Sequence, residues 1–574
     1  MSSTTGLKDS DRKIDPITAE VLRHMLMSIP RDIDTNISRT AYTPLVYDYK
    51  DYAVGLLDHR GRLISQGGGG APLFVANALG IAVEDGFRVL GPDGIAPGDV
   101  IFTNHADTLG QHLNNVAMYA PVFNDAGGEN QELVGFMAVL MHWIDIGGSR
   151  PGSIAFNATS IFQEGVQFRC VKLWSAGRPN PEIVRTLEAN TRFPRSLMGD
   201  IDAQVAGCLR GRDLLLALVV RYGVAAFRQA VELLWSRTDA AAREVVRSLP
   251  DGVYFASSLL DNDGSQLDKP LPVQVKVTIE GDEFTVDFTG TAEQVNAPIN
   301  SGRQGGAVAA ARIAFKMLTT PDEPANDGAF RALKVIVPDG TIISARPGAP
   351  MGFYSGCLPT IADTVLKALV EAAPGRVGGG HHGSFSSLTY SGVHPVTGES
   401  YLSLDTGHGG WGAQGECDGP GPFKTMVHGD TFGLPLEANE AFYPVIVESA
   451  GIWADSGGAG KFRGGNGTFR VVEVLAPMEI QIWMERTLCP AWGVRGGKDG
   501  KPGVCYVERR GQPIQEIHKG YMQVQPGDRI RLFCGGGGGW GDPAARDRDL
   551  VLADVRNGYI SDLAAEQVYG VKLK

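Results

Sequence analysis

Closely spaced cysteines are missing from this chain. Its 574 residues include seven cysteines, and none of them forms a Cys-x-x-Cys pair. Zinc ribbons, dithiol redox motifs and disulfide frameworks all need paired or regularly spaced thiols. The sequence therefore argues against these three classes of site.

Long apolar runs are missing as well. No stretch of about 18 uninterrupted apolar residues occurs, which a membrane-spanning helix would need. The start of the chain, MSSTTGLKDSDRKIDP, has no apolar core of the kind found in a secretory signal. We therefore expect neither a signal peptide nor a membrane span, and we expect a cytoplasmic protein.

Positive charge is in deficit. The 52 Lys and Arg residues are outnumbered by 64 Asp and Glu residues, which gives a net charge of -12. Such a chain repels phosphate backbones, and no basic run with interleaved aromatic residues compensates for this repulsion. Nucleic acid is not an expected partner.

Nucleotide-binding and serine-hydrolase motifs are also absent. The chain contains no G-x-x-x-x-G-K-[S/T] phosphate loop, no dinucleotide-type G-x-G-x-x-G after a strand, and no G-x-S-x-G turn. If the reaction consumes ATP, we expect another chain to bind the nucleotide.

Glycine, in contrast, is abundant. The chain has 76 glycines, a share well above the average of roughly 7%. Many lie in clusters such as GRVGGGHHG, DTGHGGWGAQG and CGGGGGWGDP. Glycine permits close approach of the backbone to a neighbour, so these clusters either contact a ligand or another subunit or form structural turns.

Periodic apolar residues predict the helices. Asp15 and Pro16 form a helix start, and apolar residues follow at spacings of three and four up to Ile37. The same spacing returns over residues 198–248 with a break at Tyr222 and Gly223, so two packed helices are expected there. Further helices are expected after Gly356 and from Ser561.

Short apolar runs and alternating patterns predict the strands. Strands are expected over residues 47–175, and alternation on both sides of Gly281 and Asp282 predicts a β-hairpin. The elements lack strict β-α-β alternation, which favours an α+β fold of several domains with glycine-rich loops and a β-rich middle segment. The expected units are an N-terminal α/β domain over residues 1–250 that holds the candidate site, a β-rich segment over 251–345, a glycine-rich α+β domain over 346–545 and a helical tail over 546–574.

Histidines, carboxylates and amides gather in two stretches that carry the candidate chemistry. The first runs from Asn104 to Asn115 and includes His112, and the second contains His142 and Asp145. His112 and Asn115 are three residues apart, as are His142 and Asp145, so a shared site is geometrically possible. Imidazole and carboxylate groups serve as metal ligands or as acid and base groups, and hydrogen-bonded loop histidines are the alternative.

Two further carboxylates precede the first expected strand. Asp48 and Asp51 could lend a carboxylate to the same site. Alternatively, they mark only the charged entrance of a strand.

Several longer blocks resemble the hydantoinase B/oxoprolinase family. The blocks are GDVIFTNHADTLGQHLNN, MHWIDIGGSRPGS, FQEGVQF, ADSGGAGKFRGGNG and CGGGGGWGDPAARDRDLVLADVRNGYIS. With the helix start, the resemblance extends from about residue 15 to the C-terminus. The combination of blocks and their order make the resemblance specific.

The resemblance implies an ATP-dependent enzyme of several subunits. A hydantoinase A-like partner would bind ATP and phosphorylate the substrate carbonyl or enolate, and the B-type chain would complete hydrolysis or carboxylation. Phosphorylation turns a poor leaving oxygen into a good one or traps an enol. The missing phosphate loop agrees with this division of work.

The resemblance also implies a divalent metal site, with Mn, Zn or Mg as the candidate ions. The matching positions are His112, Asn115 and His142, with Asp51 as a further ligand. Metal-bearing relatives carry Asp where this chain has Asn115. A neutral amide lowers the negative charge of the site and weakens divalent binding, so the sequence leaves the presence of a metal open.

The departures from the family pattern favour ketone carboxylation. Phe74 stands in an apolar stretch where many hydantoinases have Pro-Val-His-Leu-Gly, and such a stretch suits a hydrophobic substrate. We therefore expect an acetophenone carboxylase-like subunit that acts on an enol phosphate with bicarbonate, with His112, His142 and Asp145 as catalytic residues. ATP-dependent hydrolysis of a cyclic amide and a non-catalytic scaffold role are the alternatives.

Overall fold

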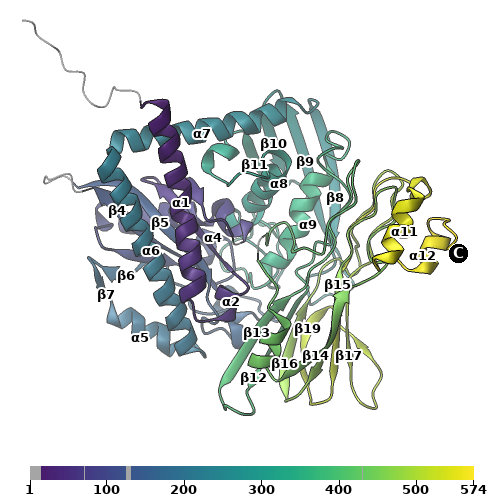
Figure 1. Ribbon diagram of the computed structural model, residues 1–574. Coiled ribbons are helices and arrows are strands. Elements are labelled where there is room, and N and C mark those ends of the chain that lie inside the picture. Colours follow the sequence, from purple (N-terminus) through teal and green to yellow (C-terminus); the bar gives the residue numbers. More distant parts are fainter. Residues whose placement is uncertain (1–13, 70, 125–130, 430, 574) are drawn as a thin grey trace, which may run out of the picture.

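The computed structural model describes residues 14–69, 71–124, 131–429 and 431–573. The named strands in these residues form four sheets, and helices pack over the first two (Figure 1). The α+β class that the sequence predicts is confirmed.

The first sheet has seven strands in the order β2-β1-β5-β4-β3-β6-β7. Helices α1 and α6 lie along one of its faces, in front of the sheet in Figure 1. The strands are β1 (Tyr52–Asp58), β2 (Leu63–Gln66), β3 (Val100–Thr103), β4 (Asn115–Asn124), β5 (Glu132–His142), β6 (Val171–Ser175) and β7 (Arg178–Pro179). The helices of this part are α1 (Pro16–Thr40), α2 (Pro44–Tyr47), α3 (Leu79–Leu90), α4 (Ala106–Leu109), α5 (Pro181–Ala189) and α6 (Pro194–Tyr222).

Helix α1 begins as its sequence predicts. The Asp15 carboxylate accepts hydrogen bonds from the N–H groups of Ile17 and Thr18, and Pro16 occupies the first turn. The two helices expected over residues 198–248 are α6 and α7 (Val224–Arg247), which part at Gly223. Among the described helices, none alone is long and apolar enough to cross a membrane; α6 and α7 would pass on length and composition only as a pair bent by 110°.

The second sheet is the expected β-rich middle segment, in the order β11-β10-β9-β8. Strands β9 and β10 form the predicted hairpin, which turns at Gly281 with φ of 60°. Helices α8 and α9 pack together, and α9 covers β8 and β9. The elements are β8 (Gly252–Leu260), β9 (Leu271–Glu280), β10 (Glu283–Asp287), β11 (Leu333–Ile336), α8 (Ala309–Thr319) and α9 (Tyr354–Lys367). One hydrophobic core runs from α1 through this sheet to α9, so the boundaries between the expected units stay predictions.

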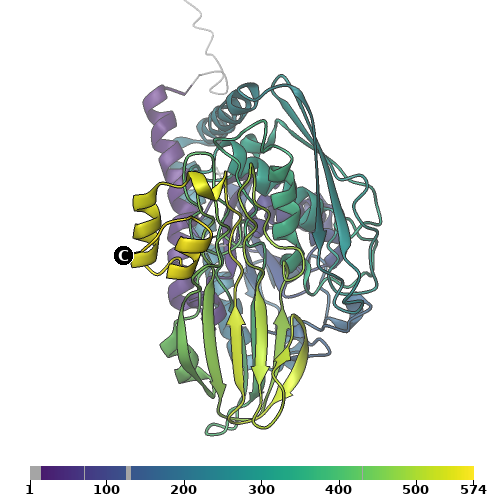
Figure 2. The ribbon, with the colours of Figure 1, turned by 90° about the vertical axis from the view of Figure 1, so that its right-hand side faces the viewer.

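Two further sheets enclose a second hydrophobic core, which includes Leu388, Ile480, Val472 and Leu532. Their strand orders are β13-β12-β16-β19 and β14-β15-β20-β17-β18. Figure 2 shows these strands at the base of the view, with α11 and α12 beside their upper ends. The strands are β12 (Ser387–Val393), β13 (Ser400–Thr406), β14 (Val445–Ile452), β15 (Thr468–Val474), β16 (Met478–Trp483), β17 (Val504–Glu508), β18 (Gln515–Glu516), β19 (Lys519–Val524) and β20 (Arg529–Phe533). The helices are α10 (Leu436–Phe442), α11 (Arg548–Arg556) and α12 (Asp562–Gln567), the last capped by Ser561 as expected.

The glycine clusters of the second half pack against one another inside the chain. The N–H of Gly538 donates to the Gly380 carbonyl at 2.8 Å, and the N–H of Gly537 donates to the Gly465 carbonyl at 3.0 Å. A Cβ atom on Gly410 would overlap the Gly465 carbonyl oxygen. These backbones approach so closely that only glycine fits, which gives the glycine-rich segments a structural role.

Candidate functional site

The candidate site lies at one end of the first sheet, where three neighbouring strands begin or end. Strand β5 pairs antiparallel with both β1 and β4. The start of β1, the end of β5 and the start of β4 are therefore neighbours, and Asn115 lies directly opposite His142. Asp51 immediately precedes β1, so strand register alone brings these three side chains together.

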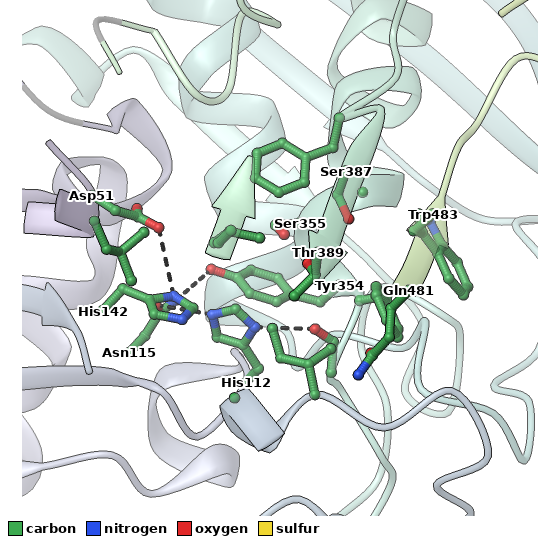
Figure 3. A pocket seen from close by; sticks show the side chains of 18 of the residues that line it. Asp51, His112, Asn115, His142, Tyr354, Ser355, Ser387, Thr389, Gln481 and Trp483 are labelled. Atoms are coloured by element: carbon green, nitrogen blue, oxygen red, sulfur yellow. Dashed lines mark hydrogen bonds and ion pairs between the residues drawn. The ribbon is translucent and has the colours of Figure 1, made fainter. Parts of the chain in front are cut away.

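His112 is held in this pocket by two contacts (Figure 3). Its Nδ1 atom lies 3.0 Å from the Gly352 carbonyl oxygen. Its Nε2 atom lies 3.0 Å from Oδ1 of Asn115. Burial lowers the pKa of His112, and the two contacts oppose this shift. The two contacts fix the orientation of the ring, and burial favours its neutral form, which donates a hydrogen bond from only one of its two nitrogens.

Asn115 is fully engaged by the protein. Its amide nitrogen donates to Oε1 of Gln111 at 3.0 Å and to the hydroxyl of Tyr354 at 2.7 Å. The Tyr354 ring also packs edge-on against His112, with centroids 5.1 Å apart. The amide therefore ties His112 to the first turn of α9.

His142 and Asp51 form the second half of the site. Nδ1 of His142 lies 3.5 Å from the Asp51 carboxylate, and the rings of His142 and His112 are 4.9 Å apart. Burial raises the pKa of Asp51 to about 7, and the nearby Lys424 ammonium opposes this shift. Burial, together with His112, lowers the pKa of His142 well below its usual range. At neutral pH His142 is therefore neutral and can accept a proton, while Asp51 lies close to its own titration midpoint.

The structure places the other expected carboxylates elsewhere. The buried Asp145 carboxylate accepts hydrogen bonds from the Ser153 hydroxyl and the Arg192 guanidinium, both at 2.9 Å. Asp145 does not line the pocket, and neither does Asp48. Asp145 therefore links two loops beside the site, at a distance from any substrate that the pocket holds.

Several residues around the site belong to no motif that the sequence analysis singles out. Tyr354 and Gly352 come from the start of α9 and the loop before it, more than 200 residues after His112. The Glu164 carboxylate accepts N–H hydrogen bonds from Met351 and Gly352 and so holds this loop in place. Burial raises the pKa of Glu164 to about 8 against these hydrogen bonds. Among these residues only Glu164 lies in a block that resembles the family, FQEGVQF.

The residues do not fit a resident divalent ion. Within the part of the chain that the structure describes, no group of three or more His, Cys, Asp or Glu side chains is placed to hold a metal. Asn115, one of the four expected ligands, carries no charge, and its amide nitrogen donates hydrogen bonds to Gln111 and Tyr354.

The rest of the pocket is largely apolar. Phe74, Ile144, Phe353 and Leu404 are among its walls. The cavity volume is about 50 Å³. One water needs at least about 10–15 Å³ by the same measure, so the cavity suits a small molecule or the reacting end of a larger one.

Comparison with known proteins gives a consistent picture. A family model described as Hydantoinase B/oxoprolinase matches residues 15–543. The β subunit of caprolactamase from Pseudomonas jessenii is 32% identical over 576 residues, which cover 97% of this chain and 96% of that protein. The crystal structure of ATP-dependent caprolactamase from Pseudomonas jessenii has a TM-score of 0.90 at 30% identity, over 98% of this chain and 97% of that chain. A nucleotide-free acetone carboxylase structure has a TM-score of 0.88 at 19% identity, over 98% of this chain and 80% of that chain, which is a likeness of fold alone.

Proposed function

Since the chain belongs to the hydantoinase B/oxoprolinase family, we propose that it completes the reaction of a small carbonyl compound that a hydantoinase A-like partner subunit has activated with ATP. The nucleotide is assigned to the partner because this chain has no phosphate loop. We also propose a cytoplasmic location, where ATP is supplied.

The convergence of Asp51, His112 and His142 in one buried pocket carries this proposal. In hydrolysis, His142 takes a proton from water as the water oxygen adds to the activated carbon. His142 then gives this proton to the ring nitrogen as the C–N bond breaks, which leaves an acyl phosphate. A second water hydrolyses the acyl phosphate to the ring-opened amino acid and inorganic phosphate. Asp51 orients the imidazole and stabilises its cationic form, as carboxylates do in catalytic triads.

His112 has a positioning role in this scheme. Its contacts with Gly352 and Asn115 fix the ring beside His142. Because both ring nitrogens already face protein atoms, we assign His112 to holding the pocket in shape and His142 to proton transfer.

Hydrolysis of a cyclic amide is the reaction that the relatives favour. The relative of 32% identity is named a caprolactamase subunit, and the likeness to acetone carboxylase at 19% identity concerns the fold. The caprolactamase subunit is similar to this chain over nearly its whole length, whereas the case for ketone carboxylation depends on Phe74 and its apolar neighbours. We therefore prefer cyclic amide hydrolysis.

Ketone carboxylation remains the second candidate. Phe74 lines the pocket beside other apolar side chains, as a hydrophobic ketone would require. In that reaction the enol carbon of an enol phosphate would attack carbon dioxide derived from bicarbonate. The O–P bond would break as the ketone re-forms, and the phosphoryl group would pass to water and leave as inorganic phosphate.

The test is to co-purify this chain with its partner and to compare substrates. ATP consumption and product are measured with caprolactam or 2-pyrrolidone, and separately with acetophenone plus bicarbonate. Ring-opened amino acid supports cyclic amide hydrolysis, and carboxylated ketone supports the second candidate. ATP-dependent conversion of neither compound class would refute the proposed function.

A further inference from the structure

The wall of the pocket opposite the histidines is a patch of regular sheet. Strands β12 and β16 pair antiparallel, with Ser387 opposite Trp483 and Thr389 opposite Gln481. Alternate residues on one strand face the same side, so all four side chains point to the pocket that they line. Figure 3 shows them on the side of the cavity away from Asp51 and His142.

The polar atoms of this wall have hydrogen-bonding capacity to spare. Nε1 of Trp483 is buried and has no hydrogen-bond partner among the described residues. The side chains of Ser387, Thr389 and Gln481 likewise make no hydrogen bond to any residue that the structure describes, although Ser387 and Gln481 are buried. Buried polar groups are nearly always paired, so these atoms are placed to pair with a bound molecule.

Positive charge is absent from the same wall. No Lys or Arg is among the described residues that line the pocket. Lys519 lies behind this wall, with its ammonium over the Trp483 ring at 4.5 Å, and it forms a buried ion pair with Glu485. Its charge is therefore already neutralised, and its Nζ also donates to the Asn262 carbonyl at 2.8 Å.

A carboxylate on the substrate would have no counter-ion at this wall. Burying an unpaired ionised carboxylate costs far more than burying an amide or hydroxyl that finds hydrogen bonds. A neutral acceptor or donor, in contrast, can bond to Gln481, Thr389 and the Trp483 N–H. The wall thus distinguishes charged from uncharged substrates.

We propose that the β12–β16 wall binds the uncharged end of the substrate by hydrogen bonds, so that this enzyme takes neutral cyclic amides and rejects amides that carry a carboxylate. This inference rests on the proposed function and names its substrate class. It assigns Gln481 and Thr389 as specificity-determining residues.

The test uses the co-purified complex and two lactams with the same ring, 5-oxoprolinamide and 5-oxoproline, which carry a neutral carboxamide and a carboxylate at the same position. We expect kcat/KM for the neutral lactam to be at least about 100-fold higher. Equal rates, or preference for 5-oxoproline, would overturn the inference and leave the proposed function standing. Failure to convert any lactam or ketone would refute the proposed function, and the inference would fall with it.

Substitutions at the wall give an independent readout with a larger neutral substrate that carries a second polar group, a cyclic imide such as glutarimide. Gln481→Leu should raise KM about fivefold with little change in kcat, as expected for one lost hydrogen bond. Gln481→Arg should raise kcat/KM for 5-oxoproline relative to 5-oxoprolinamide. The matched control Gln523→Leu lies on the neighbouring strand, is exposed and does not line the pocket, so KM should not change. Unaltered KM in Gln481→Leu and unaltered selectivity in Gln481→Arg, with normal melting temperatures, would contradict the assignment.

Discussion

Replacing Asn115 with Asp should convert the site into one that binds a divalent cation. The substitution adds a carboxylate 3.0 Å from Nε2 of His112, in a pocket that already holds His142 and Asp51. Its surroundings can accept the change. The Tyr354 hydroxyl can donate to the new carboxylate, and the buried Gln111 Nε2 has no hydrogen-bond partner among the described residues and is free to turn toward it.

The expected magnitude follows from the charges. Two unit charges 4 Å apart interact by about 4 kcal/mol at an effective dielectric constant of about 20, so a divalent ion gains about 8 kcal/mol from one added carboxylate. Desolvation of the buried ion costs several kcal/mol, which offsets part of this gain. We expect a net gain of about 3 kcal/mol, which is a roughly 100-fold tighter Kd.

Without metal, the same substitution should destabilise the protein. The new carboxylate would lie close to Asp51 with no cation in the pocket, and an uncompensated buried charge costs about 3 kcal/mol or more. The measurement is thermal unfolding of wild type and Asn115→Asp with chelator and with Zn²⁺ or Mn²⁺, together with calorimetric titration. Asn124→Asp, on the same strand and outside the pocket, is the matched control.

The reasoning predicts a low melting temperature for the metal-free variant and a rise on metal addition that the wild type lacks. Equal metal affinity in wild type and variant would refute it. So would a variant that neither loses stability in chelator nor gains it with metal.

Two other perturbations test the packing and the electrostatics. Gly537→Ala should cost about 3 kcal/mol of unfolding free energy or prevent folding, because its Cβ would overlap the Trp411 backbone, whereas Gly375→Ala has open space and should be neutral in urea unfolding. A large effect at both glycines or at neither would contradict the packing. The pKa of Asp51 rises from its ordinary value of 3.8 to about 7, so between these values the folded state keeps a proton that the unfolded state releases. Its contribution to stability therefore falls as pH rises through this window. Asp51→Asn should remove part of this fall when unfolding at pH 5 and pH 8 is compared, and an unchanged pH dependence would show that Asp51 titrates normally.

The sequence anticipates much of the local structure because local signals decide it. The Asp15 cap with Pro16 and the break at Gly223 are such signals, as is the turn at Gly281. Helix α3 lies within residues 47–175, where the short apolar runs predict strands, and its own apolar residues around Gly80 and Gly86 resemble such runs. Periodicity alone does not separate a short buried strand from a buried helix.

Part of the candidate site could likewise be predicted from the sequence, and part could not. The family resemblance groups Asp51, His112, Asn115 and His142, and their positions at the ends of strands of one sheet explain why the structure brings them together. Tyr354 and the β12–β16 wall could not be predicted, since they reach the pocket only through packing between distant parts of the chain. From the sequence, the glycine clusters could either contact a ligand or another subunit or form structural turns. The hydrogen bonds between their backbones support the structural role.

The most direct test of the account measures ADP and ring-opened product separately in the co-purified complex, for wild type, His112→Ala and His142→Ala. If the partner activates the substrate and this chain completes the reaction, wild type couples the two. Both variants should then lose product formation by about 100-fold or more, while ADP release by the partner continues. Product formation at the wild-type rate in both variants would contradict the account and leave this chain a scaffold role.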